Sequence, residues 1–231
     1  MPPIHHKIVV ILSGGMDSLT LVEQLHRDGK DVNALTFNYG QKHSKEVGYA
    51  KRACKRLMIP QKMAYMETLK YLLESALTKE DTPVPHGHYE EASMMQTVVP
   101  NRNMIMLSVA AGYAASIGAT AVAFAAHAGD HAIYPDCRPK FLKTLNATLT
   151  ESMYDSVEVI APYLTMTKGD IAKVGMELGI LYHAHAWTCY EGKAKACGKC
   201  GACVERAEAL EFAGYDPEVT LATMEAADEQ S

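Results

Sequence analysis

The chain has 231 residues, of which 48% are hydrophobic and 21% are charged, and it carries a formal net charge of -5. This composition is typical of a folded globular protein and excludes a disordered or fibrous chain, while the lack of a basic surplus argues against nucleic acid as a partner. The longest apolar run near the start, residues 8–12, is too short for a membrane span or a signal peptide. We therefore expect a cytoplasmic protein with no part in a membrane.

Expected strands and helices alternate along the chain. Short β-branched and aliphatic runs predict strands, and apolar residues three or four positions apart predict helices. The expected strands are 7–12, 31–37, 62–66, 120–125 and 157–160. The expected helices cover 19–25, 47–57, 104–117, 139–153 and 167–179, with one short helix near the C-terminus. The last long helix begins with a Thr-x-x-Asp pattern that resembles a capping box. This alternation predicts an α/β fold with a doubly wound, parallel sheet of about five strands.

Two further segments complete the predicted organisation. Residues 82–97 contain prolines, histidines and acids without a period, which predicts a loop or a lid. We expect residues 1–180 to form the α/β domain. Residues 181–231 are expected to form a small C-terminal zinc-binding helical segment that packs on this domain and ends in a polar tail.

A glycine-rich turn lies between the first expected strand and helix. Residues 13–18 read Ser-Gly-Gly-Met-Asp-Ser. The glycines let backbone amides approach an anion, the helix N-terminus adds partial positive charge, and the two serine hydroxyls can donate hydrogen bonds. No Walker lysine and no Gly-x-Gly-x-x-Gly pattern is present, so the usual P-loop and dinucleotide interpretations fail. The turn predicts a pyrophosphate-binding loop, the alternative being a tight turn in which Asp17 or Ser18 only caps the helix.

Four of the six cysteines are clustered near the C-terminus, while Cys54 and Cys137 stand apart. Without a secretion signal, this clustering favours a metal over disulfide bonds. The spacing is Cys-x7-Cys-x2-Cys-x2-Cys, which predicts a structural zinc site with four thiolate ligands. An iron-sulfur cluster and four reduced, buried cysteines are the alternatives. The expected ligands are Cys189, Cys197, Cys200 and Cys203.

Several motifs occur in an order that resembles the 7-cyano-7-deazaguanine synthases of the queuosine pathway, which belong to the N-type ATP pyrophosphatases. Besides the turn and the cysteines, the motifs are Tyr39-Gly40-Gln41, Pro100-Asn101-Arg102-Asn103, Tyr134-Pro135-Asp136-Cys137-Arg138 and Trp187-x-Cys189-Tyr190. Each motif alone has an ordinary structural explanation, such as a turn or a helix start. The resemblance covers roughly residues 8–217.

The resemblance implies an adenine nucleotide alpha hydrolase-like fold and an ATP-dependent reaction. ATP would adenylate the carboxylate of 7-carboxy-7-deazaguanine, and ammonia would displace AMP to give an amide. A second ATP would activate the amide oxygen, and loss of AMP would leave the nitrile. Each activation would release pyrophosphate. The resemblance also implies a structural zinc, Mg²⁺ and a homodimer, with small molecules as the partners.

The resemblance further implies roles for individual residues. Asp17 is expected to help hold Mg²⁺, and Lys168 and Arg102 are expected to stabilise charge on the phosphates, although Lys168 also fits a solvated surface position. The residues expected at the nucleotide are Leu12, Ser13, Gly14, Gly15, Met16, Asp17, Ser18 and Leu19. The residues expected at the deazapurine are Asp130, Tyr134 and Asp136, with Arg138 at the carboxylate.

Two other functions fit parts of the pattern. A related tRNA thiolase would use Cys137 as a sulfur-carrying nucleophile, and a non-catalytic zinc module would bind nucleic acid or a protein. The acidic charge argues against the thiolase, and the intact turn argues against the module. A metal site at His127 and His131 is disfavoured because no third ligand is evident nearby.

Three positions depart from what is common in the family. Ala186 stands where threonine is expected, Thr188 where serine is expected, and Ala126 where glycine is frequent. Thr188 keeps a hydroxyl group, but Ala186 does not. The departure at Ala186 therefore puts one hydrogen bond of the pocket in doubt.

Overall fold

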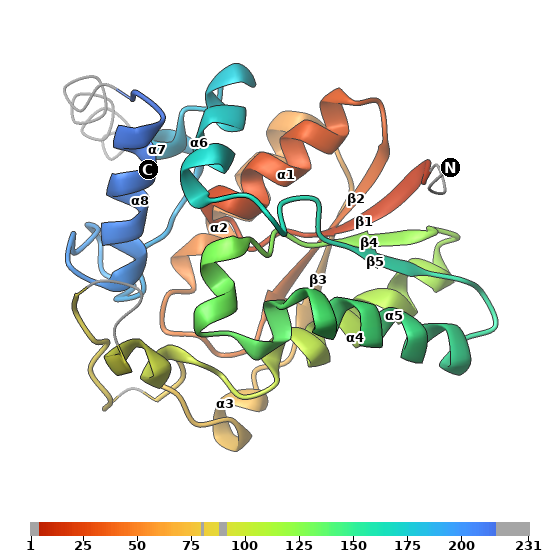
Figure 1. Ribbon diagram of the computed structural model, residues 1–231, viewed down its shortest axis with the longest axis horizontal. Helices are drawn as coiled ribbons and strands as arrows, with labels where there is room; N and C mark the ends of the chain where they lie inside the picture. The colour runs from red at the N-terminus through yellow and green to blue at the C-terminus, as the bar shows by residue number, and fades with distance from the viewer. Residues whose placement is uncertain (1–4, 80, 88–91, 216–231) are drawn as a thin grey trace.

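Five parallel strands form the centre of the protein (Figure 1). The structure, a computed structural model, describes residues 5–79, 81–87 and 92–215. The order of the strands across the sheet is β3-β2-β1-β4-β5, which confirms the predicted doubly wound arrangement. The register pairs Val9 of β1 with Asn33 of β2 on one side and with Val122 of β4 on the other. The strands are β1 (Lys7–Ile11), β2 (Asp31–Asn38), β3 (Gln61–Tyr65), β4 (Ala121–Ala123) and β5 (Glu158–Ile160).

The order of the strands determines where a ligand can bind. The chain runs outward from β1 through β2 to β3, and then returns to the other side of β1 to form β4 and β5. The loops that follow β1 and β4 therefore leave the same edge of the sheet in opposite directions. A crevice forms at such a switch point, outside the carboxyl ends of the strands.

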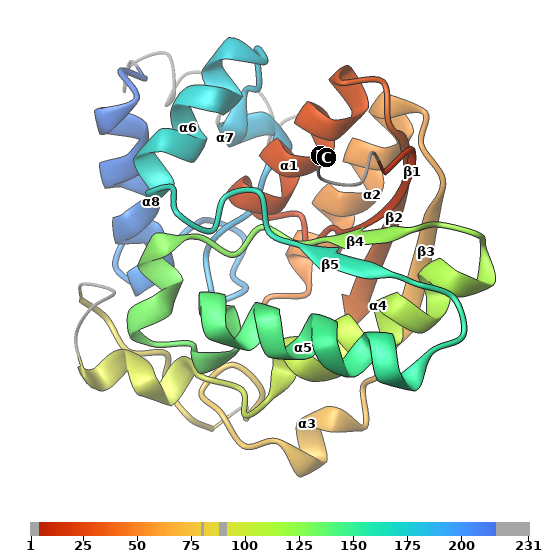
Figure 2. The ribbon, with the colours of Figure 1, turned by 45° about the vertical axis from the view of Figure 1, so that its right-hand side comes forward.

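Helices cover both faces of the sheet (Figures 1 and 2). Alternate residues of β1 point to opposite faces, so Val9 packs into the core on the side of α4, whereas Val10 packs into the core on the side of α1. One layer contains α1 (Met16–Arg27), α2 (Lys45–Leu57) and α6 (Lys168–Glu177). The other layer contains α4 (Arg102–Ser116) and α5 (Pro139–Ser152).

The start of α6 confirms the predicted capping box. The hydroxyl group of Thr167 accepts a hydrogen bond from the backbone N–H of Asp170 at 3.2 Å, and the Asp170 carboxylate accepts one from the backbone N–H of Thr167 at 3.0 Å. These two bonds satisfy donors that have no partner inside the helix. Gly179 follows the helix with a φ of 74°, a left-handed conformation that suits glycine.

The segment predicted as a loop or lid contains more structure than its composition indicates. Residues 88–91 lie outside the described part, but Ala92–Thr97 forms the 3₁₀ helix η1. Met94 and Thr97 are fully buried, and the carbonyl of Gln96 accepts a hydrogen bond from the backbone N–H of Ala76 at 2.8 Å. Tertiary packing, which no local pattern reveals, thus orders the end of this segment. A second short helix that the sequence did not predict is α3 (Leu69–Leu72).

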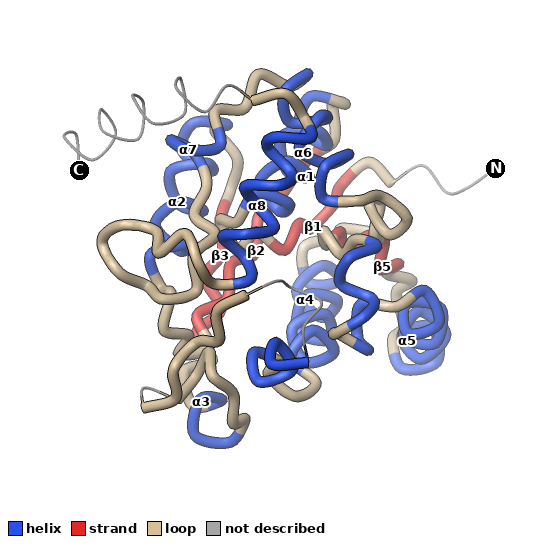
Figure 3. Tube along the Cα trace, turned by 60° about the vertical axis from the view of Figure 1, so that its left-hand side comes forward, coloured by secondary structure: helices blue, strands red, loops and turns tan. Residues whose placement is uncertain are grey.

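The C-terminal segment packs on the layer that contains α1 and α6 (Figure 3). Its elements are α7 (Tyr182–His185) and α8 (Gly201–Phe212), and the predicted polar tail, 216–231, lies outside the described residues. Tyr182 is fully buried, and its hydroxyl group lies 2.5 Å from that of Thr20 in α1. In the part of the chain that the structure describes, no helix has both the length and the apolar character needed to cross a bilayer.

Candidate active site

A cavity of about 230 Å³ opens at the switch point of the sheet. Its walls come from the loops after β1, β2 and β4, from the starts of α2, α4 and α6, and from residues 187–190. The position agrees with the place predicted for the glycine-rich turn. A cavity of this kind, with a few convergent polar groups, is the usual form of a small-molecule site.

The glycine-rich turn has the geometry of an anion-binding loop. Gly14 has a φ of 99°, and a Cβ atom there would lie 2.1 Å from the carbonyl oxygen of Glu46 in α2, so only glycine fits. The hydroxyl oxygens of Ser13 and Ser18 lie 3.0 Å apart, and the Ser13 hydroxyl accepts a hydrogen bond from the N–H of Gly15 at 3.1 Å. Hydroxyl groups and helix-terminal amides are thus gathered at the N-terminus of α1.

Most, but not all, of the residues predicted at the nucleotide line this cavity. Leu12, Ser13, Gly15, Met16, Asp17 and Ser18 do so. Gly14 does not, because it packs against α2, and its carbonyl oxygen accepts a hydrogen bond from the N–H of Trp187 at 2.9 Å. Leu19 is fully buried in the core between the sheet and its helices.

A row of charged groups lies beside the loop. The ammonium group of Lys168 is 3.3 Å from the carboxylate of Asp17 and 2.6 Å from that of Glu205 in α8. Burial lowers the pKa of Lys168, but the carboxylates of Asp17 and Glu205 outweigh this effect, so the pKa is raised and the ammonium stays charged. The other carboxylate oxygen of Asp17, Oδ1, is buried and has no hydrogen-bond partner among the described residues. The lysine is therefore not a solvated surface residue.

His127 connects this charged row to the loop after β4. Its Nε2 atom lies 4.0 Å from the Asp17 carboxylate and 3.7 Å from that of Asp130. Its Nδ1 atom accepts a hydrogen bond from the N–H of Gly129 at 3.1 Å, which places the proton of the neutral ring on Nε2. Burial raises the pKa of the Asp130 carboxyl group. Among the described residues, His131 belongs to no group of three side chains that could share a metal ion.

Aromatic side chains also line the cavity, among them Tyr39, Tyr134 and Tyr190. The guanidinium group of Arg102, at the start of α4, donates a hydrogen bond to the Tyr39 hydroxyl at 3.2 Å. Burial lowers the pKa of Arg102, but the nearby hydroxyl groups of Tyr39, Tyr134 and Tyr190 have a larger opposite effect. The net pKa is raised, so the group stays charged. The Tyr134 hydroxyl lies 3.3 Å from that of Thr97.

Two of the residues predicted at the substrate do not line the cavity. The Asp136 carboxylate accepts hydrogen bonds from the backbone N–H and the side-chain amide of Asn103, at 2.9 and 3.2 Å. Arg138 is exposed, and its Nε donates to the carbonyl of His131 at 2.8 Å. Asp130 and Tyr134, in contrast, are among the lining residues.

Cys137 lies in the cavity wall and is buried. Burial, with a smaller contribution from the carboxylates of Asp130 and Asp136, raises the pKa of its thiol. Because the thiolate is the nucleophilic form, this environment opposes a role as a sulfur nucleophile.

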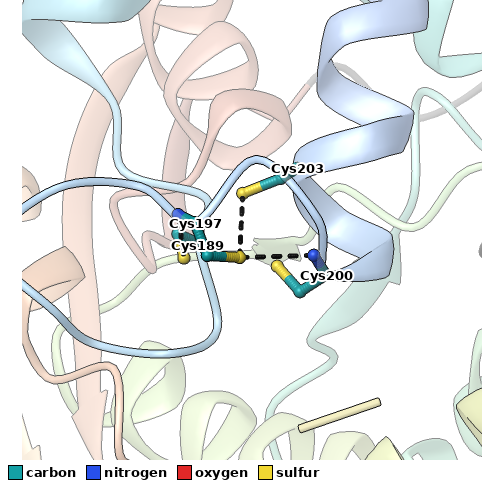
Figure 4. A group of neighbouring side chains, drawn as sticks. All are labelled: Cys189, Cys197, Cys200 and Cys203. Carbon is teal, nitrogen blue, oxygen red and sulfur yellow. Dashed lines mark hydrogen bonds between the residues drawn. The ribbon is translucent and has the colours of Figure 1, made fainter. Parts of the chain in front are cut away.

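The four C-terminal cysteines form one cluster (Figure 4). Their sulfur atoms all lie within 4.8 Å of one another, and none of them forms a disulfide bond. Backbone N–H groups of Lys199 and Cys200 donate to the sulfur of Cys197 at 3.4 and 3.3 Å, which stabilises a thiolate. Four convergent sulfur atoms fit a closed tetrahedral zinc site, and none of the four cysteines lines the cavity.

Residues 187–190 join the cysteine cluster to the cavity. The indole N–H of Trp187 donates to the carbonyl of Cys189 at 3.0 Å, while Trp187, Thr188 and Tyr190 line the cavity. The Thr188 hydroxyl is buried and has no hydrogen-bond partner among the described residues, and Ala186, two positions earlier in the chain, is also buried. The cluster therefore sets the position of one cavity wall.

Three acidic or basic residues of the site carried no signal in the sequence. Glu46 lines the cavity, and its carboxylate lies 3.3 Å from the Nε2 atom of His43, another lining residue. Glu205 lies two positions after the last cysteine and reaches Lys168 only because α8 packs along α6. Glu205 depends on a contact between distant segments, and His43 and Glu46 line the cavity only because the start of α2 packs against the glycine-rich turn. Single-sequence patterns do not reveal such contacts.

Solved structures with low sequence identity share the fold. The chain is 15% identical to an NMN synthetase from Francisella tularensis, with a TM-score of 0.53 over 84% of this chain and 71% of that one. It is 14% identical to a U34-tRNA thiolase from Methanococcus maripaludis, with a TM-score of 0.52 over 99% and 73%. These similarities establish the adenine nucleotide alpha hydrolase-like fold that the resemblance implied.

Closer relatives establish the family. The chain is 53% identical to a 7-cyano-7-deazaguanine synthase from Methanoregula boonei over 90% of this chain and 95% of that protein. It is 50% identical to a protein of the same name from Pseudoalteromonas translucida over 89% and 94%. Residues 7–214 match the model of the family described as queuosine biosynthesis protein QueC. The chain therefore belongs to the QueC family of 7-cyano-7-deazaguanine synthases.

Proposed function

We propose that this protein converts 7-carboxy-7-deazaguanine and ammonia to 7-cyano-7-deazaguanine at the expense of two ATP molecules. The observation that carries the proposal is the match to synthases of this name along nearly the whole chain. The cavity supports it, because an anion-binding loop, a lysine with little exposure and several aromatic side chains line the same space. ATP and a planar base can thus meet over the switch point of the sheet.

The first step needs positioned charge rather than a strong nucleophile. A carboxylate oxygen of the base attacks the α-phosphorus of ATP, and the bond to the pyrophosphate oxygen breaks. Negative charge then grows on the departing pyrophosphate. The loop amides around Gly15 and the ammonium group of Lys168, whose side chain is only 10% exposed, stabilise this charge.

Ammonia completes the first half of the reaction. Its lone pair attacks the activated carbonyl carbon, a proton leaves the nitrogen, and AMP departs with the oxygen it received, which leaves the amide. In the second half, the amide oxygen attacks the α-phosphorus of another ATP and pyrophosphate departs. Loss of AMP with the amide oxygen, and of both protons from the nitrogen, then forms the nitrile. The balance is two AMP and two pyrophosphate for each nitrile.

Two metal ions fit the donor atoms of the protein. Asp17 would hold Mg²⁺ together with the phosphates, and its buried, unpartnered Oδ1 atom supports this role. That ion supplies charge neutralisation for the phosphates. The four cysteines would hold a structural Zn²⁺, supported by their convergent sulfur atoms.

The base is proposed to bind beside the aromatic residues Tyr39, Tyr134 and Tyr190 of the cavity wall. Tyr134 would contact the deazapurine ring, and Asp130 would accept hydrogen bonds from its nitrogen donors. Arg102 would stabilise negative charge, since its guanidinium group is partly buried and donates its hydrogen bond to the Tyr39 hydroxyl rather than to a carboxylate. Asp136 would act through Asn103, and Arg138 would reach the carboxylate only after releasing the carbonyl of His131.

Three remaining proposals rest on the family resemblance and the sequence. These are a homodimer, a cytoplasmic location, and a division at residue 180 between the α/β domain and the zinc-binding segment. Sedimentation of the purified protein at several concentrations tests the first of them. A sedimentation coefficient of a single chain at every concentration would contradict the homodimer.

A product assay tests the proposed reaction. The purified protein is incubated with ATP, Mg²⁺, ammonium and the carboxy base, and products are separated by mass. We expect the nitrile together with two AMP per molecule of base consumed. One AMP and an amide would mean that the reaction stops halfway, and thiolated tRNA without consumption of the base would favour the thiolase instead.

A further inference from the structure

Glu205 is the main partner of Lys168, although it lies outside the cavity wall. The Lys168 ammonium donates a hydrogen bond to Glu205 at 2.6 Å, whereas its 3.3 Å contact with Asp17 is an ion pair only. The Lys168 side chain is only 10% exposed, so its charge depends on these carboxylates rather than on water. Glu205 does not line the cavity, so any effect on the chemistry must pass through Lys168.

The position of Glu205 is fixed from two sides. It lies in the second turn of α8, two residues after Cys203 of the cysteine cluster. Its other carboxylate oxygen, Oε1, is so close to the loop after β4 that a Cβ atom at Gly129 would lie 3.2 Å from it. The carboxylate therefore lies between α6 and the loop that carries His127 and Asp130.

The charge balance explains what this carboxylate does. If Glu205 were neutral, Lys168 would keep Asp17 as its only ion-pair partner in the described structure. The pair would then tighten, because a buried ammonium group seeks the nearest carboxylate. A tightened pair would withdraw Asp17 from a metal ion and Lys168 from a phosphate at the same time.

We propose that Glu205 is a positioning residue that holds Lys168 beside the phosphate loop and keeps Asp17 available to the cation of ATP. This inference rests on the proposed function, because it assigns Asp17 and Lys168 to the phosphates. It also gives the C-terminal segment a role in the reaction. The helix that begins at the cysteine cluster supplies the contact that places the lysine.

The test compares Glu205→Gln with Glu211→Gln, an exposed position on the same helix. Glutamine keeps the shape of the side chain but removes the charge. We expect kcat for pyrophosphate release to fall about a hundredfold in Glu205→Gln, as for other misplaced catalytic groups. The Mg²⁺ concentration needed for half-maximal rate should rise, and Glu211→Gln should match the wild type in both measurements.

A double-mutant cycle separates positioning from general stabilisation. If Glu205 acts through Lys168, then Glu205→Gln should have no further effect in a Lys168→Ala background. An equal loss in both backgrounds would overturn the proposal, as would a Glu205→Gln protein with wild-type kcat. Glu205→Asp keeps the charge but shortens the side chain, so it should give an intermediate kcat. This variant replaces Glu205→Gln in the test if Glu205→Gln does not fold.

A binding measurement distinguishes failure of this inference from failure of the proposed function. Calorimetry with Mg²⁺ and ATP, in the absence of the base, should show weaker binding in Glu205→Gln than in Glu211→Gln. If the wild type ignores the carboxy base but this difference persists, the proposed function fails and the positioning role stands. If the wild type converts the base and the two variants bind ATP and turn over equally, only the positioning role fails.

Discussion

The phosphate loop and the cysteine cluster are both short, glycine-containing turns, yet their polar groups are arranged in opposite ways. In the loop, the Asp17 carboxylate has a buried oxygen with no hydrogen-bond partner in the described part of the chain, and most of the surrounding residues line a cavity. In the cluster, the four sulfur atoms face one another and none lines the cavity. Groups that line a cavity can bind a substrate, whereas four sulfur atoms that converge on one point can hold only an ion between them, which stabilises the fold. The two turns should therefore respond differently to substitution.

The largest expected effect is the loss of activity in Asp17→Ala. Removal of the carboxylate takes away the proposed ligand of Mg²⁺, and we expect pyrophosphate release to fall by a factor on the order of a thousand or more. The melting temperature should change little, because Glu205 still neutralises Lys168. Rates and melting curves of the same sample check both statements. Full activity in this variant would show that the loop does not hold the phosphates as proposed.

Cys200→Ser should show the opposite behaviour, with a large loss of stability. One thiolate fewer weakens a site whose metal-binding free energy is part of the folding free energy, and we expect less soluble protein and a loss of bound zinc. Metal analysis of the wild type should find about one zinc per chain. Cys54→Ala, which removes a buried thiol outside the cluster, is the control and should retain its zinc. Iron in the wild type, or no metal at all, would contradict the zinc assignment.

Arg102→Met tests whether the positive charge of Arg102 contributes to the reaction, beyond the volume that its side chain fills. The substitution keeps much of the side-chain volume but removes the partly buried guanidinium group and its hydrogen bond to Tyr39. We expect kcat/KM for the base to fall about tenfold to a hundredfold, the range for a lost charged hydrogen bond. Tyr39→Phe removes only the partner hydroxyl and should cost less. Equal losses in the two variants would assign the effect to the orientation of Arg102 rather than to its charge.

The smallest expected effect belongs to Cys137→Ala. The thiol is buried and its pKa is raised, so we expect it to pack and to position Asn103 rather than to react. Conversion of the base should fall by no more than about tenfold, consistent with a slightly altered cavity. Mass analysis of the products measures this directly. If conversion vanishes while ATP and the base still bind, a covalent role for Cys137 replaces our interpretation.

The sequence predicted those parts of the protein in which local chemistry decides the structure. The strands of the sheet, the turn at residues 13–18 and the four cysteines are each determined by residues close together in the chain. Glu205 could not be predicted, because its contact with Lys168 exists only after α8 packs along α6. Asp136 lies within a motif of the site, yet it does not line the cavity, and its carboxylate accepts hydrogen bonds from Asn103, which does. The order of the motifs predicted which segments lie near the site, but not the direction in which their side chains point.

The hydrogen bond between Trp187 and Gly14 has a consequence for the order of folding during synthesis. The last strand of the sheet ends at Ile160, so a nascent chain can form the whole sheet before Trp187 leaves the ribosome. At that stage, the phosphate loop lacks its contact with residues 187–190 and the cavity lacks one wall. Because domains begin to fold as they emerge, the nucleotide site should mature only after the sheet that carries it.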